Sequence, residues 1–101
     1  MKVALIINPV AGNGRGGKAG QKTLEALTQQ GVACHPFISE YPGHAVAIAE
    51  GLDLTGLDTV VAVGGDGTVF EVINGRLRAE APPTTTLGVV PVGSGNSLSQ
   101  D

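Results

Sequence analysis

Four short runs of apolar, mostly β-branched residues recur along the chain, and a glycine-containing loop or turn follows each of them. The runs cover Val3–Asn8, Val32–Ser39, Thr59–Val63 and Leu87–Val92. Continuous apolar runs of this length are typical of strands that are buried on both faces of a parallel sheet, although Pro36 weakens the second run. The sequence therefore predicts four parallel strands.

Between these runs the apolar positions change to helical spacing. Good helix formers fill Lys18–Gln30, and Gly31 is a natural helix stop. Two further stretches repeat apolar residues every three or four positions, which predicts amphipathic helices. The first has Ala45, Ile48, Ala49 and Leu52, and the second has Val69, Val72, Ile73 and Leu77. The segments Pro9–Gly17 and Ala79–Thr86 are expected to be loops.

Strands and helices thus alternate, and their connections are short. This order predicts an α/β fold with three layers around an open, mostly parallel sheet, formed by residues 1–101 as one unit. Ligands of such sheets bind outside the carboxyl ends of the strands. Glycine loops follow three of the four strands at those ends, so we expect them to meet in one crevice.

Composition narrows the class of function. The formal charge is −3 and the six Lys and Arg residues are scattered, which argues against nucleic-acid binding. Cys34 is the single cysteine, so no internal disulfide can form and a reducing compartment fits. Asn8-Pro9 ends the first apolar run too early for a signal peptide, and no run reaches membrane-spanning length. A cytoplasmic protein is expected.

The strongest candidate for chemistry is Gly64–Thr68, which reads Gly-Gly-Asp-Gly-Thr between a predicted strand and a predicted helix. In this context backbone N–H groups and the helix dipole hold phosphate. The carboxylate of Asp66 indicates phosphoryl transfer, because it could orient Mg²⁺ or act on the attacking hydroxyl. The structural alternative is a glycine-rich turn in which Asp66 is a turn former.

Other polar residues leave two interpretations open. Thr68 and Glu71 have the spacing of a capping box. Glu71 is either part of that cap or a catalytic or nucleotide-contacting residue, and Thr68 can both cap the helix and face the site. The first glycine loop fits Gly-x-x-x-x-Gly-Lys, but Ala19 stands where a P-loop has Ser or Thr, so a P-loop NTPase is rejected. His35 and His44 have no partners at metal-ligand spacing, and His44 is interpreted as a surface residue.

Taken together, four segments resemble the catalytic domain of the diacylglycerol kinase and sphingosine kinase superfamily. They are Asn8-Pro9, Gly43-His44-Ala45, Gly64–Thr68 with Glu71–Gly75, and Leu87–Asn96, in family order over essentially the whole chain. The resemblance implies transfer of phosphate from ATP, with Mg²⁺, to a lipid hydroxyl. It implies a fold related to phosphofructokinase and NAD kinase, in which residues 1–101 are the N-terminal nucleotide-binding part and the C-terminal lipid-binding domain is absent.

The resemblance also implies site residues. Asp66 occupies the position assigned in sphingosine kinases as proton acceptor from the lipid alcohol, whereas bacterial diacylglycerol kinases have the assigned base and Mg²⁺ ligands in the C-terminal domain. No metal ligand is therefore assigned in this chain. The positions implied for nucleotide are Asn8, Pro9, Val10, Ala11, Gly12, Ser39, Gly65, Asp66, Gly67, Thr68, Val69, Phe70, Glu71, Gly93, Ser94 and Gly95.

The sequence also departs from the family pattern. Phe70 stands where bacterial members usually have Asn, and Asn96-Ser97-Leu98 replaces the common Asn-Asp-Phe. The second departure, together with Gly43-His44-Ala45, is closer to the sphingosine or ceramide kinase branch. An NAD kinase-like enzyme and a non-catalytic nucleotide-binding or interaction module are the alternatives.

The absence of the second domain has two consequences. We expect these 101 residues to be inactive alone, since a lipid substrate at a membrane surface would be held by the missing domain. We also expect self-association, because a sheet that ends after four strands leaves apolar surface uncovered.

Overall fold

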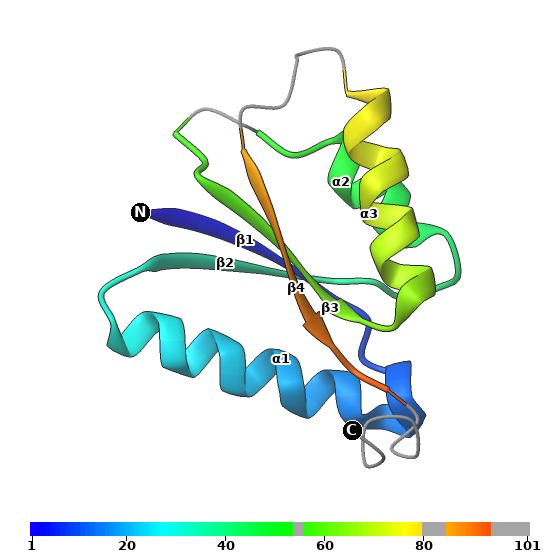
Figure 1. Ribbon diagram of the computed structural model, residues 1–101, viewed down its shortest axis with the longest axis horizontal. Helices are drawn as coiled ribbons and strands as arrows, with labels where there is room; N and C mark the ends of the chain where they lie inside the picture. The colour runs from blue at the N-terminus through cyan, green and yellow to red at the C-terminus, as the bar shows by residue number, and fades with distance from the viewer. Residues whose placement is uncertain (54–55, 80–84, 94–101) are drawn as a thin grey trace.

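The computed structural model describes residues 1–53, 56–79 and 85–93, and its helices cover both faces of a central sheet (Figure 1). The strands are β1 (Lys2–Ile7), β2 (Ala33–Ile38), β3 (Thr59–Gly64) and β4 (Thr86–Pro91). They pair in the order β2-β1-β3-β4, and every pair is parallel. The predicted three-layer α/β fold with a parallel sheet is confirmed.

The two faces of the sheet are covered by different helices. Helix α1 (Ala11–Gln29) lies on one face, and α2 (His44–Glu50) and α3 (Asp66–Arg78) lie on the other (Figure 1). Side chains alternate along β1 accordingly. Leu5 belongs to the core beneath α1, whereas Ile6 packs with the residues of α2 and α3. The two central strands, β1 and β3, are buried on both faces, which explains their continuous apolar runs.

The edge strands β2 and β4 are more exposed than the central pair. Pro36 lies in β2 and pairs with Leu5. A proline has no N–H to donate, so it is tolerated at a sheet edge and makes that edge a poor template for another strand.

Helix α1 differs from the prediction at its start. It begins at Ala11 rather than Lys18, and residues 12–14 interrupt it with positive φ angles of 62°, 60° and 92°. Glycines that indicated a loop instead allow close packing. A Cβ at Gly16 would overlap the carbonyl of Asn8, and a Cβ at Gly20 would lie 2.7 Å from the side chain of Ile7. Small residues therefore let α1 approach the end of β1.

Helices α2 and α3 pack closely because small residues line their contact. Ala45 and Ala49 of α2 are buried, as is Gly75 of α3. Helix α2 ends at Glu50, so Leu52 lies beyond the helix in which it was predicted. None of the described helices has the length and hydropathy to span a bilayer.

The connections diverge where β1 and β3 end. The chain leaves β1 through α1 on one face toward β2, and it leaves β3 through α3 on the other face toward β4 (Figure 1). This point of divergence is where open α/β sheets bind ligands, because the two loops separate there and leave a crevice.

Candidate active site

The loops that follow β1, β3 and β4 meet at the carboxyl ends of the strands. The N–H of Asn8 donates to the carbonyl of Val63 at 2.9 Å, and the N–H of Val92 donates to the carbonyl of Gly64 at 2.9 Å. Gly12 lies against the end of β4, where an added Cβ would be 2.6 Å from the Val92 side chain. The predicted convergence is confirmed as far as Gly93. Ser94 and Gly95 lie outside the described residues.

A side-chain hydrogen bond joins the first of these loops to the Gly-Gly-Asp-Gly-Thr loop. Asn8 donates from Nδ2 to Thr68 Oγ1 at 3.2 Å, and its Oδ1 accepts from the N–H of Val10 at 3.2 Å. Thr68 is buried, and a Cβ at Gly64 would overlap its hydroxyl. The Asn8 amide therefore fixes both the turn after β1 and its distance from α3.

The start of α3 corrects the capping-box interpretation. The helix begins at Asp66, and Gly65 is the residue before it, with no side-chain cap. Thr68 and Glu71 thus both lie inside the helix. The N–H of Val69 donates to the carbonyl of Gly65 at 3.1 Å. The N–H groups of residues 66–68 precede that bond, and in a helix such groups have no intrahelical acceptor. They are available to an anion.

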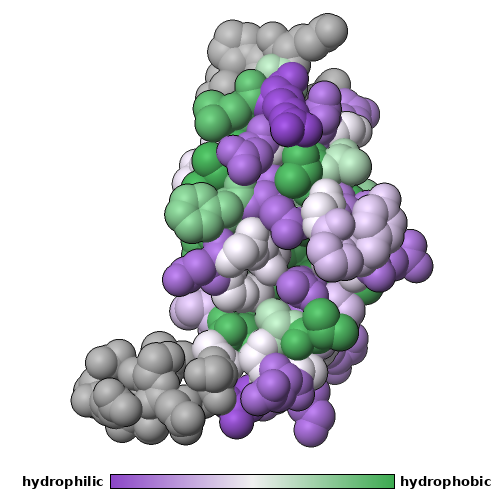
Figure 2. Space-filling model, turned by 90° about the vertical axis from the view of Figure 1, so that its right-hand side faces the viewer, coloured by the Kyte–Doolittle hydropathy of each residue, from purple (hydrophilic) through white to green (hydrophobic). Residues whose placement is uncertain are grey.

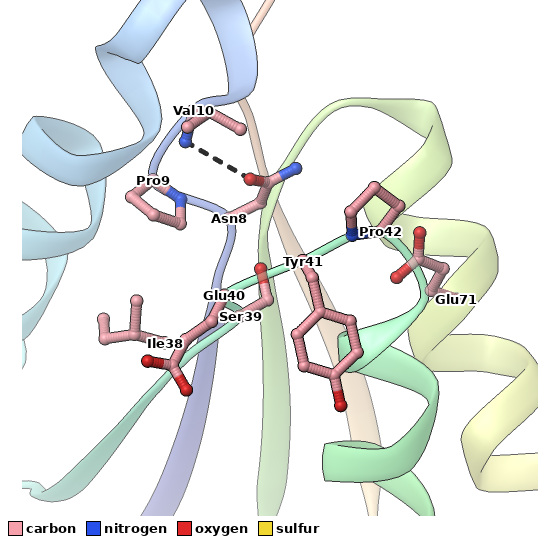
Figure 3. Close-up of a pocket in the computed structure, with 9 residues that line it drawn as sticks. All are labelled: Asn8, Pro9, Val10, Ile38, Ser39, Glu40, Tyr41, Pro42 and Glu71. Atoms are coloured by element: carbon pink, nitrogen blue, oxygen red, sulfur yellow. Dashed lines mark hydrogen bonds between the residues drawn. The ribbon is translucent and has the colours of Figure 1, made fainter.

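A cavity of about 390 Å³, here called the first cavity, opens beside this hydrogen bond (Figure 3). Its volume is within the range of small-molecule sites, roughly 300–1,000 Å³. Figure 3 shows the Ser39 hydroxyl pointing toward Asn8, whose amide is turned toward Val10, with Glu71 on the α3 side and the Tyr41 ring on the side away from Val10. The lining residues are Asn8, Pro9, Val10, Ile38, Ser39, Glu40, Tyr41, Pro42 and Glu71.

Polar groups of this cavity are already held by hydrogen bonds. The Ser39 hydroxyl is buried and donates to the carbonyl of Ile7 at 3.3 Å. Its oxygen lone pairs remain able to accept from a ligand hydroxyl or amine. The carboxylate of Glu71 lines the same cavity and can accept hydrogen bonds as well.

A second cavity of about 220 Å³ lies on the β4 side of the loop. Among the described residues, Asp66 is the only titratable one that lines it, and most of the other side chains are apolar. The lining residues are Gly64, Gly65, Asp66, Val69, Val89, Pro91, Val92 and Gly93. A carboxylate beside apolar walls can approach a hydroxyl that is attached to an apolar group.

The remaining predicted residues are divided between core and surface. Ala11 packs against the core beneath α1, and Gly67 is exposed with open space around its Cα. Phe70 is 66% exposed and lines neither of the two cavities. The outer surface on the α2–α3 side is mixed, with apolar side chains set among polar ones (Figure 2).

An aromatic pair, of which Tyr41 lines the first cavity, was not predicted from the sequence. The rings of Tyr41 and His44 stack with centroids 4.4 Å apart and planes inclined by 10°. The N–H of Glu40 donates to His44 Nδ1 at 2.9 Å, so His44 makes two contacts within its own turn at the surface. The place of Glu40–Gly43 in the sequence could have indicated these residues, because the segment follows a predicted strand at its carboxyl end, where ligands bind.

Within residues 1–53, 56–79 and 85–93, no group of three or more His, Cys, Asp or Glu side chains could hold a metal ion.

Comparisons with known proteins find relatives along nearly the whole chain. The family model of the diacylglycerol kinase catalytic domain matches residues 2–101. Diacylglycerol kinase of Bacillus subtilis (strain 168) is 32% identical over 98% of the chain, which spans 32% of that protein. Sphingosine kinase 2 of Homo sapiens is 31% identical over 97% of the chain, which spans 16% of that protein.

Sphingoid long chain base kinase 5 of Saccharomyces cerevisiae is 33% identical over 96% of the chain, which spans 15% of it. A crystal structure of a diacylglycerol kinase from Bacillus anthracis str. Sterne superposes with a TM-score of 0.69 at 33% identity, over 98% of this chain and 35% of that one. The chain thus spans a third or less of each of these three relatives and about a third of the chain in this crystal structure.

Proposed function

The chain belongs to the diacylglycerol kinase catalytic domain family, and from that premise we propose that it is the ATP-binding part of a lipid kinase. It would bind ATP where β1, β3 and β4 end and present the γ-phosphate to a lipid hydroxyl. The observation that carries the proposal is the hydrogen bond between Asn8 and Thr68. This bond joins the loop that lines the first cavity to the helix whose first residue, Asp66, lines the second cavity.

The first cavity suits the nucleoside end of ATP. Ser39 and Glu71 offer acceptors for ribose hydroxyls, and the cavity volume of about 390 Å³ is adequate for a nucleoside. The phosphates would extend from there toward the free N–H groups at the start of α3. The helix dipole and these N–H groups both stabilise negative charge. A Cβ added at Gly67 would meet nothing within 4 Å, so a phosphate can approach the backbone there.

The second cavity suits the acceptor. The oxygen of the lipid alcohol would bond to the γ-phosphorus while the bond from that phosphorus to the bridging oxygen breaks and ADP leaves. The Asp66 carboxylate lines this cavity and would accept the hydroxyl proton. Bound Mg²⁺ would neutralise charge on the phosphates. The protein's own contribution is mainly to position the reactants and to fix the dipoles that face the transferred group.

The binding half of this proposal is tested by calorimetric titration of the chain with ATP. Thr68→Val keeps the shape of the side chain but leaves Asn8 Nδ2 without its acceptor, so we expect weaker ATP binding. Thr28→Val is the matched control, because Thr28 is exposed near the far end of α1. Equal ATP affinity in the two variants would show that the bond between the loops does not shape the site.

The catalytic half needs a form that also carries a lipid-binding domain. Radiolabelled ATP is offered with a lipid extract and with NAD in parallel reactions. We expect label in lipid only, with Asp66→Asn abolishing it and Asp58→Asn, at the opposite end of β3, leaving it intact. Label in NAD would instead favour an NAD kinase-like enzyme, and lipid phosphorylation by residues 1–101 alone would contradict the expected inactivity of the isolated chain.

A further inference from the structure

We propose that Tyr41, supported by His44, is the surface on which the nucleobase of the bound nucleotide stacks. This inference rests on the proposed ATP site and assigns a purine to the part of the first cavity that Tyr41 lines. Tyr41 is the aromatic residue among the nine that line this cavity. It remains 60% exposed, which leaves a large apolar ring area for a planar ligand to cover.

The contact with His44 fixes the position of the Tyr41 ring. His44 stacks on it at 4.4 Å between centroids with nearly parallel planes. His44 is itself held, because its Nδ1 accepts the N–H of Glu40 at 2.9 Å. Since Nδ1 is the acceptor, the proton of the neutral ring is on Nε2. Two contacts of the same short turn thus hold the ring before a ligand arrives, which reduces the entropy lost on binding.

The turn itself is also anchored to the sheet. The N–H of His44 donates to the carbonyl of Tyr41 at 3.0 Å, and the N–H of Ser39 donates to the carbonyl of Ile7 at 2.9 Å. Gly43 has a φ of 88°, a conformation that few other residues adopt, and this permits the chain to enter α2 directly from the turn. Tyr41 is therefore placed at a set distance from Asn8 and Ser39 rather than on a free surface loop.

The chemistry on the other walls fits a nucleoside whose base lies on Tyr41. Asn8, Ser39 and Glu71 provide polar groups of the cavity, and Pro9 and Ile38 provide apolar area. Stacking on an aromatic ring is tolerant of base identity but increases with the area of the base. We therefore expect ATP and GTP to bind more tightly than CTP and UTP, and all four to bind more tightly than inorganic triphosphate.

A direct probe exists because Tyr41 is the only tyrosine of the chain. Its ring protons give one set of NMR signals, and a stacked purine shifts such signals upfield. The chain is titrated with ATP and, separately, with inorganic triphosphate. We expect an upfield shift with ATP and none with triphosphate, since the latter has no ring.

Affinity measurements on variants complete the test. Tyr41→Ala should weaken ATP binding about tenfold, in line with the cost of losing one stacked base, and leave triphosphate binding unchanged. Tyr41→Phe should keep the ATP affinity. Phe37→Ala is the control, because Phe37 is a partly exposed aromatic residue of β2 that does not line the first cavity.

Variants of His44 separate its two contacts. His44→Asn can keep an acceptor for the Glu40 N–H but removes the stacked ring, whereas His44→Ala removes both. If His44 acts by positioning Tyr41, both variants should weaken ATP binding, with the larger loss in His44→Ala, and neither should change triphosphate binding. The combination of either with Tyr41→Ala should add nothing further.

The outcomes distinguish this inference from the proposed function. The stacking assignment is wrong, while the ATP site stands, if ATP binds but the Tyr41 ring signals do not move and Tyr41→Ala binds ATP with unchanged affinity. If the unmodified chain binds neither ATP nor triphosphate, the proposed function fails and the stacking assignment fails with it. Because Tyr41 is largely exposed, Tyr41→Ala is expected to fold, which circular dichroism checks.

Discussion

Two glycines of the same helix, Gly67 and Gly75, should respond in opposite ways to the same substitution. Both lie in α3, near its two ends. A Cβ at Gly67 would meet nothing within 4 Å, whereas a Cβ at Gly75 would overlap the carbonyl of Val46, lie 2.6 Å from Ala49 Cβ and lie 3.0 Å from the backbone nitrogen of Glu50. Alanine at Gly75 would therefore push α2 away from α3.

The magnitude follows from two opposing effects. Alanine is favoured over glycine inside a helix by about 0.8–1.0 kcal/mol, and this gain applies to both positions, somewhat less near the helix start. Overpacking of a close contact costs about 1–3 kcal/mol, and more where the obstructing atoms belong to backbone that cannot rotate away. We expect Gly67→Ala to stabilise the fold by roughly 0.5–1 kcal/mol. Gly75→Ala should destabilise it by about 2 kcal/mol, because the obstruction outweighs the helix preference.

The assay is thermal and urea unfolding followed by circular dichroism. A difference of about 3 kcal/mol between the two variants corresponds to roughly 12–24 °C in Tm for a domain of this size. The same samples are titrated with ATP, where Gly67→Ala should bind more weakly despite its greater stability, since the new methyl group occupies the space proposed for phosphate. Equal Tm values for the two variants would refute the packing argument, and unchanged ATP binding by Gly67→Ala would refute phosphate approach at that residue.

Three further predictions concern other parts of the chain. Asp66→Asn should leave the unfolding transition near that of the unmodified chain while abolishing lipid phosphorylation in a form with a lipid-binding domain, and turnover comparable to that of the unmodified form would remove Asp66 from the mechanism. Burial raises the pKa of the Cys34 thiol above its ordinary value of 9.0, so the native thiol should react with iodoacetamide more slowly than in urea. The neutral thiol's contribution to stability is present below about pH 9 and is lost as pH rises through the higher native pKa, so the free energy of unfolding should fall in that range. An equal fall in the free energy of unfolding of Cys34→Ala would contradict this origin. Leu87 and Val89 are exposed on the edge strand β4, so we expect concentration-dependent self-association that Val89→Lys suppresses, and a monodisperse monomer of the unmodified chain in light scattering would refute it.

Several features could be predicted from local pattern because their causes are local. The apolar runs of β1 and β3 and the helical spacing of α3 depend on which faces are buried, and the sequence records this directly. The end of α1 was predicted at the correct turn, since Gly31 follows the helix with a φ of 81°. The convergence of glycine loops followed from the rule that parallel strands end at one edge.

The predicted start of α1 and the capping-box alternative at the start of α3 were wrong for a common reason. Glycines at 12, 14, 16 and 17 have the composition of a loop, yet the last two belong to a helix that packs against the end of β1. Thr68 and Glu71 have the spacing of a cap, yet Thr68 is buried and bonds to Asn8, which is 60 positions away. In both cases a contact between distant segments decided between two locally acceptable conformations.

The sequence by itself determined the order of elements, the family resemblance and the loop that carries Asp66. Only the tertiary structure decided that Asn8 holds Thr68, that Asp66 and Glu71 line different cavities, and that Tyr41 rests on His44. The physical reason is that periodicity and turn chemistry act over a few residues, whereas a cavity is formed by side chains from strands that become neighbours only when the sheet assembles. Its shape and polarity therefore depend on packing distances that no local pattern encodes.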